Sequence, residues 1–182
     1  MHRNDLKSKL EKYQPTDQTE IADKSKMLIF LEANENCFER SLTIGHFTGS
    51  CWLENYDGTK FLLTLHKKIG LWLQLGGHAD GNSDIVQVAM KEAHEESGLK
   101  NIEIKSADIF DLSVHLVNEY KNIPAHYHYD VRFLLKASDP NEHIAISEES
   151  TDLRWFSEPP ISRDFYGCEL WRMYDKWKET KK

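Results

Sequence analysis

The spacing of apolar residues near the start of the chain predicts two helices. Leu6 and Leu10 stand four positions apart within 4–13, which predicts a short helix that ends before Pro15. Asp17, with a glutamate three residues later, is a candidate N-cap for a second helix that runs to about residue 34. The apolar positions expected on the docked face of this second helix are Ile21, Met27, Leu28 and Leu31. We interpret residues 1–40 as a helical leader that serves either for packing on the body or for dimerisation.

Residues 41–182 show a different pattern, in which short strands alternate with few helices. Strands are expected at 42–53 and 61–66 around a hairpin turn at 55–58, then as a short apolar run before Gly76, and later near 102–117, 125–136 and 153–156. One helix is expected at about 84–97, where Gly98 would end it, and a C-terminal helix from about Ser162. This order predicts one α+β domain with a mixed sheet flanked by helices.

The helix at 84–97 places three carboxylates together. Glu92, Glu95 and Glu96 stand at i, i+3 and i+4, so they share one helical face. Like charges at this spacing destabilise an isolated helix by about 0.2–0.5 kcal/mol per pair. A divalent cation would convert that repulsion into coordination, because carboxylate oxygens are the ligands that Mg²⁺ and Mn²⁺ prefer. The pattern therefore predicts a metal site.

The stretch 77–99 resembles the Nudix box, G-x5-E-x7-R-E-U-x-E-E-x-G-U, where U is a bulky aliphatic residue. Two glycines, three glutamates and a terminal leucine stand at the fixed offsets of that motif. Three positions depart from it: Ser83 replaces the first glutamate, Lys91 replaces the arginine, and Ala93 is small for U. Lys91 keeps the charge of the arginine but lacks its bidentate fork.

The resemblance implies a Nudix-like α/β/α sandwich over 41–182 and a hydrolase that uses Mg²⁺ or Mn²⁺ to cleave a diphosphate linkage in a nucleoside diphosphate derivative. The metal ligands implied by the motif are Glu92, Glu95 and Glu96, with the backbone carbonyl of Gly76 as a fourth. Glu95 and Glu96 would then be catalytic. The general base would come either from the box, as Glu96, or from a later loop, where Glu149 is the candidate.

A second polar feature lies at 124–132. Strand alternation puts His126, His128, Asp130 and Arg132 on one face. The simplest interpretation is a hydrogen-bonded, half-exposed strand face. Substrate contact by Arg132, His126 and His128 is one alternative, and a second metal site is another. His78 directly follows the glycine pair and would reach the same pocket as a further substrate contact.

Other residues receive weaker assignments. Aromatic candidates for stacking on a base, each of which fits the core equally well, are Phe47, Trp52, Trp72 and Tyr120. His46 and His115 receive no role.

Charge and cysteine content narrow the function classes. The net charge is −7 and no basic stretch precedes 178–182, so stable nucleic-acid binding is not expected, whereas a nucleotide held through a metal is. The three cysteines are widely spaced and form no CxxC pair, which indicates reduced thiols in a cytoplasmic protein. The start of the chain has no apolar core for a signal peptide, and the longest apolar run, 27–31, is too short to span a bilayer.

Two alternatives to the hydrolase remain open from the sequence. Ser83 and Lys91 leave room for a binding or regulatory module that kept the fold and lost turnover. A diphosphate isomerase of the same fold would use a cysteine with a glutamate, and Cys51 lies on an early strand.

Overall fold

The computed structural model describes residues 2–164 and 169–182 as four helices and seven strands. The helices are α1 (His2–Lys12), α2 (Gln18–Ala33), α3 (Ile85–Ser97) and α4 (Leu170–Glu179). The strands are β1 (Gly45–Glu54), β2 (Phe61–His66), β3 (Trp72–Leu73), β4 (Leu75–His78), β5 (Ile102–Val117), β6 (His126–Ala137) and β7 (Ser150–Phe156). Cys168 lies outside the described residues. No helix in the described part of the chain has the length and apolar content that a membrane crossing requires.

The strands form one mixed sheet in the order β3-β2-β1-β6-β5, with β4 paired to β1 and β7 paired to β2. β1 runs parallel to β6 and antiparallel to β2 and β4. The predicted mixed sheet is therefore confirmed. Register places His46 opposite His128 and Thr48 opposite both Asp130 and His78, which brings distant polar residues onto one face.

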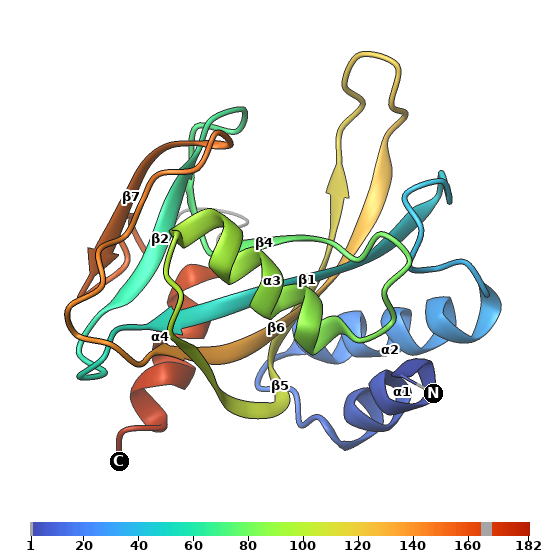
Figure 1. Ribbon diagram of the computed structural model, residues 1–182. Helices are drawn as coiled ribbons and strands as arrows, with labels where there is room; N and C mark the ends of the chain where they lie inside the picture. The colour runs from blue at the N-terminus through green and yellow to red at the C-terminus, as the bar shows by residue number, and fades with distance from the viewer. Residues whose placement is uncertain (1, 165–168) are drawn as a thin grey trace.

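Helices cover both faces of this sheet, so the predicted α/β/α layering is confirmed. α3 crosses one face, over β1 and β4, and α4 lies behind the sheet in the same view (Figure 1). Successive residues of β1 point to opposite faces: Cys51 and Leu53 join the core under α3 and the leader, whereas Trp52 joins the core under α4.

The N-terminal helices share the larger core. Met27 and Leu31 are fully buried among sheet residues, and Phe30 stacks on Tyr129 of β6 with ring centroids 3.8 Å apart. Ile21, expected on the docked face, is instead 47% exposed.

Glu20 and Asp23 of α2 are buried near that position because both have partners. Glu20 forms an ion pair with Lys176 of α4, and Asp23 accepts a hydrogen bond from the backbone N–H of Val114 on β5 at 3.0 Å. Charged side chains thus occupy part of the docked face of α2.

The C-terminal helix begins at Leu170, eight residues later than the expected Ser162. Its apolar positions explain this start, since Leu170, Met173, Tyr174 and Trp177 follow the helical period and all pack on the second core. Residue 162 has no regular structure, and residues 163 and 164 belong to a turn.

Both ends of α3 are capped. Asp84 is its N-cap and accepts from the N–H of Gln87. Gly98 ends the helix with φ of 72°, a left-handed conformation that glycine adopts without steric cost, as predicted.

Candidate active site

The glycines of β4 allow α3 to approach the sheet closely. A Cβ atom on Gly77 would lie 2.5 Å from the carboxyl carbon of Glu92, and one on Gly76 would lie 2.0 Å from the hydroxyl oxygen of Ser50. Both distances are well inside van der Waals contact. Glycine at these positions therefore permits the carboxylate of Glu92 to rest against the strand.

Glu96 is the most deeply placed carboxylate of α3. Its side chain is 8% exposed, and its Oε1 accepts a hydrogen bond from the backbone N–H of Gly76 at 2.8 Å. Burial raises the pKa of Glu96 to about 8, with a smaller upward contribution from the charges of Glu92, Glu149 and Glu95. The hydrogen bond from Gly76 opposes this shift. Glu96 is thus hydrogen-bonded to the glycine strand and lies close to other carboxylates.

Lys91 partly neutralises the other two box carboxylates. Its Nζ lies 3.1 Å from Glu92 Oε1 and 3.0 Å from Glu95 Oε2. The amine is exposed, so these pairs are weak. Burial, helped by the charges of Glu95 and Glu149, still raises the pKa of Glu92 despite Lys91. The lysine therefore contacts both carboxylates without cancelling their repulsion.

Glu149 faces the box from the loop that precedes β7. Its backbone carbonyl accepts from the N–H of Lys67, which fixes the loop against β2. The charge of Glu149 is one of those that raise the pKa of Glu92 and Glu96. The structure thus brings this exposed loop carboxylate into the electrostatic range of the box.

Arg40 is a cation within electrostatic range of Glu92 and Glu149, and it was not expected at the site from the sequence. It forms a bidentate ion pair with Asp80, which raises its pKa, and the charges of Glu92 and Glu149 raise the pKa further. No motif marks Arg40, which precedes β1 by five residues. Only the fold places it beside the box.

These residues fit a hard divalent cation. Two of the three carboxylates of α3, those of Glu92 and Glu96, lie against the glycine strand, and within the described part of the chain the buried one, Glu96, accepts a single hydrogen bond, from Gly76. Carboxylate oxygens crowded in this way are the usual donor set for Mg²⁺ or Mn²⁺. Ser83 adds no charge to that set, and the Oδ1 atom of Asp84 is engaged in capping α3.

On the opposite face of β4, histidines gather. Ligand nitrogens of His46, His78 and His128 all lie within 4.8 Å of one another. Both ring nitrogens of His46 are buried, and neither forms a well-aligned hydrogen bond with any residue in 2–164 or 169–182. Burial lowers the pKa of His46 and of His78 to about 4 and that of His128 to about 3, so the three rings are neutral at pH 7.

His126 extends this cluster. Its Nε2 lies 3.3 Å from Nε2 of His128, and its Nδ1 lies 2.8 Å from the carbonyl oxygen of Pro124. From the sequence, His126, His128 and His78 are expected in one pocket and His46 has no role; substrate contact by His126, His128 and His78 stays a prediction. The available signal was register, because His46 and His128 occupy paired positions of parallel strands.

The rest of that polar face is an ion-pair network. The guanidinium of Arg132 contacts Asp130 at 2.7 Å, Asp111 at 2.8 Å and Glu169 at 2.6 Å. Asp130 also accepts from the hydroxyl of Ser50. Arg132 and Asp130 are buried, so the expected half-exposed face is wrong for these two: neighbouring carboxylates and α4 cover them. Phosphate contact by Arg132 stays a prediction, with its charge already balanced by three carboxylates.

Cys51 does not have the surroundings of a nucleophile. Its thiol is fully buried under α3, and burial raises its pKa well above the usual range. A thiol in that state is a poor source of thiolate. The isomerase alternative therefore gains no support from Cys51.

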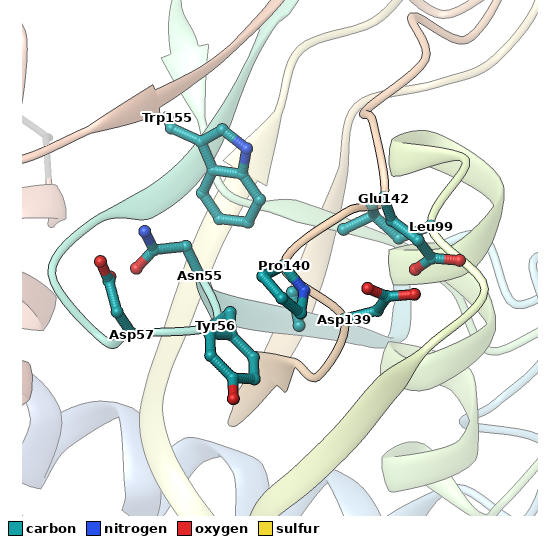
Figure 2. Close-up of a pocket in the computed structure, with 9 residues that line it drawn as sticks. Asn55, Tyr56, Asp57, Leu99, Asp139, Pro140, Glu142 and Trp155 are labelled. Carbon is teal, nitrogen blue, oxygen red and sulfur yellow. The ribbon is translucent and has the colours of Figure 1, made fainter.

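The lining of one cavity includes none of the box glutamates, and another cavity borders the polar strand face. The first, of about 220 Å³, is lined by the turn between β1 and β2, the β6–β7 loop and Trp155 (Figure 2). Glu142 in that cavity is engaged by the backbone N–H groups of Lys100 and Asn101. A second cavity, of about 250 Å³, has an apolar lining that includes Trp72, with Gln74, Ser113, His115, Arg132 and Glu169 as polar members.

The four aromatic candidates for stacking on a base lie in different environments. Phe47 and Trp52 are fully buried in the two cores, Tyr120 is exposed at the β5–β6 turn, and Trp72 lines the second cavity.

Comparison with solved structures identifies the fold. A NUDIX-family hydrolase from Clostridium perfringens matches with a TM-score of 0.52 and 20% identity over 74% of this chain and 97% of that chain. An Ap4A hydrolase from C. elegans, solved as a binary complex, matches with a TM-score of 0.53 and 18% identity over 74% and 94%. An ADP-ribose pyrophosphatase from Streptococcus suis matches with a TM-score of 0.50 and 20% identity over 75% and 91%.

The chain therefore has the fold of the Nudix hydrolases, which confirms the predicted resemblance at that level. No sequence-family model matches the chain, and no curated protein matches it. At identities of 20% or less, these three likenesses establish architecture, and the chemistry has to be argued from the site itself.

Proposed function

We propose that the protein is a divalent-metal-dependent hydrolase that cleaves a diphosphate linkage in a nucleoside diphosphate derivative. The observation that carries this proposal is the carboxylate group of α3 held against the glycine strand, with Glu149 facing it from a loop. Glu92, Glu95 and Glu96 would hold Mg²⁺ or Mn²⁺, together with the carbonyl of Gly76. Fold neighbours that are named as an Ap4A hydrolase and an ADP-ribose pyrophosphatase support the same substrate class.

The charge of a diphosphate explains why this donor set matters. Its oxygens repel a nucleophile, and a bound divalent ion neutralises that charge, orients the phosphates and acidifies a coordinated water. The residues of the chain then have separate tasks. Lys91 contacts Glu92 and Glu95, the Gly76 N–H holds Glu96, and Arg40 supplies a further positive charge for the phosphates.

Two carboxylates compete for the role of general base. Glu96 is buried and hydrogen-bonded to the strand, whereas Glu149 is exposed and carries no ligand role in the box. A residue that accepts a proton from water needs access to solvent and a free oxygen. We assign the general base to Glu149 and the metal-holding role to Glu96.

The second cavity is the proposed place for the nucleoside part of the substrate. Trp72 and its apolar neighbours offer a stacking surface, while Gln74 and Ser113 offer hydrogen-bonding groups. Trp72→Ala would then raise KM by tenfold or more and change kcat little, since stacking acts on the ground state and the transition state alike.

Product release across a panel of substrates tests the proposal. The panel contains nucleoside triphosphates, ADP-ribose, NADH, diadenosine polyphosphates and sugar nucleotides, each assayed with Mg²⁺, with Mn²⁺ and with a chelator, and with Glu96→Gln as the blank. We expect chelator-sensitive cleavage of at least one member. Silence with metal binding intact would indicate a non-nucleotide diphosphate, and silence without metal binding would favour the regulatory module.

A further inference from the structure

The histidines on the face of β4 opposite to the box form a group that the proposed hydrolysis does not use. His46 comes from the start of β1, His128 from its parallel partner β6, and His78 from the end of β4. Their ring centroids are 5.0 or 5.1 Å apart in every pair. Three strands that are distant in the sequence thus bring three imidazoles to one point.

We infer that His46, His78 and His128 bind a divalent transition-metal ion of the Zn²⁺ class, at a site separate from the carboxylates of the box. Neutral imidazole nitrogens are the ligands that Zn²⁺, Ni²⁺ and Cu²⁺ favour, whereas Mg²⁺ prefers oxygen. This inference does not depend on the proposed hydrolase activity.

The strongest support is the environment of His46. The ring is 3% exposed, and neither nitrogen makes a well-formed hydrogen bond to a described residue, because the backbone of Leu42 is only a weak contact. A buried polar atom without a partner is destabilising, so such atoms are rare in folded proteins. A metal ion bound to one nitrogen would satisfy it and would explain why a polar ring is retained there.

The hydrogen bonds around His126 orient a second ligand. Nδ1 of His126 donates to the carbonyl oxygen of Pro124 at 2.8 Å, which leaves its Nε2 as an acceptor. Nε2 of His128 lies 3.3 Å from that nitrogen, within hydrogen-bond distance, so the two rings contact each other through these atoms. Metal-binding histidines are commonly oriented in this way by a hydrogen bond at the other nitrogen. His126 is therefore a positioning residue for His128.

The required movement is small. Ligand nitrogens about 2.0–2.1 Å from a tetrahedral zinc ion are roughly 3.3 Å from each other. Those of the three histidines already lie within 4.8 Å. Binding would require the nitrogens to approach one another by about 1.5 Å, and we infer that rotation of the side chains supplies this while strand pairing keeps the backbone in place.

Direct metal binding by the untagged full-length chain tests the site. The protein is stripped with a chelator, given excess Mg²⁺ to occupy the box, and titrated with Co²⁺ while its visible absorption is recorded. We expect one equivalent to bind with the intense bands of a low-coordinate nitrogen site, and Zn²⁺ to displace it.

Variants separate this site from the box. His78→Gln and His128→Gln, both at half-buried positions, should each weaken Co²⁺ binding by tenfold or more, and the double variant should abolish it. Glu95→Gln with Glu96→Gln should retain it, and the exposed His143→Gln is the matched control for a lost histidine. Loss in the glutamate variant together with retention in the histidine variants would overturn the inference.

A measurement on the wild-type chain tests the site without relying on variants that could misfold. Long-range proton–nitrogen NMR of the imidazole rings reports each histidine individually. One equivalent of Zn²⁺ should shift the ring nitrogens of His46, His78 and His128 and leave those of His143 unchanged. Uniform small shifts of every histidine, or none, would contradict a site at these three rings.

Discussion

At the scale of single residues, the proposed site depends on a close approach between one glutamate and one glycine strand. Glu92 rests where a side chain on Gly77 would otherwise lie, and Glu96 accepts from the N–H of Gly76. Both contacts keep carboxyl groups close to one another, and the raised pKa values of Glu92 and Glu96 reflect the cost of ionising them there. The arrangement therefore carries an electrostatic cost that a bound divalent cation would offset.

Gly77→Ala tests the close approach. The added methyl group would meet the flexible end of Glu92 rather than backbone, so the carboxylate can swing away at little cost to folding. We expect the midpoint of thermal unfolding to change by only a few degrees and the Kd for Mn²⁺ to rise by tenfold or more. Electron paramagnetic resonance of free Mn²⁺ measures the Kd, with Glu92→Gln for comparison. An unchanged Kd would mean that Glu92 is not a ligand.

The general base is tested with adjacent glutamates. Glu149→Gln should lower kcat by a hundredfold or more, because general-base catalysis contributes about 10²–10⁴. Glu148→Gln is the matched control, since it removes the same charge from the neighbouring exposed position, and should stay within about twofold. If the two variants are alike, the base belongs to the box and Glu96 takes the role.

At the scale of elements, the leader packs with α3 on one face of the sheet, and α4 packs on the other face. α1 and α2 contribute Leu6, Leu10, Met27 and Leu31 to the core that also lies under α3. Their buried side chains indicate that residues 1–40 are held by packing. The role of this leader in dimerisation stays a prediction.

Substitutions on α2 measure that packing. Met27→Ala removes a fully buried side chain and should lower the free energy of unfolding by about 2–5 kcal/mol. Ile29→Ala, two residues away and exposed, should change it by about 0.5 kcal/mol or less. Urea unfolding followed by circular dichroism gives both values. Equal effects would place the leader away from the core.

The sequence predicted the elements with strong local signals and missed what depends on tertiary contact. The hairpin at 55–58, the helix ended by Gly98 and the long strands follow from turn chemistry and alternation. The late start of α4 and the exposure of Ile21 do not, because both depend on which residues the rest of the fold leaves room to bury.

The site divides in the same way. The three glutamates of the box share a helix turn, so spacing alone brings them together. Arg40 and His46 join their sites only through sheet register and loop path, and no motif marks them. Arg132 is an intermediate case. Strand alternation predicts the face on which it lies, but not its three carboxylate partners, which come from separate parts of the fold.

At the scale of the whole molecule, a buried charge network ties the leader, the sheet and α4 together. Asp111 of β5 contacts Arg132, Arg172 and Lys176, and Lys176 also donates to the hydroxyl of Tyr13 at 2.6 Å. Removing one member would leave buried opposite charges unpaired, which typically costs about 3–5 kcal/mol. The network therefore couples α4 and the leader to the integrity of the sheet.

The network predicts a component of acid sensitivity. Although burial opposes ionisation, the cations around Asp111 outweigh it and lower its pKa to about 2. A depressed folded-state pKa gives stability that is present above the unfolded value, near 4, and is lost as the pH falls toward 2. That component is on the order of 2 kcal/mol. Carbon-13 NMR of the Asp111 carboxyl group should show it ionised at pH 3, and protonation at pH 4 would contradict the assignment.

The most direct test of the central claim is the rate of diphosphate cleavage by the wild type and by Glu96→Gln, measured side by side with saturating Mg²⁺ and with a chelator. We predict chelator-sensitive turnover in the wild type and a loss of a hundredfold or more in Glu96→Gln, which corresponds to about 2.7 kcal/mol of transition-state stabilisation. Equal rates in the two proteins, or turnover that persists without metal, would contradict a metal site at the box.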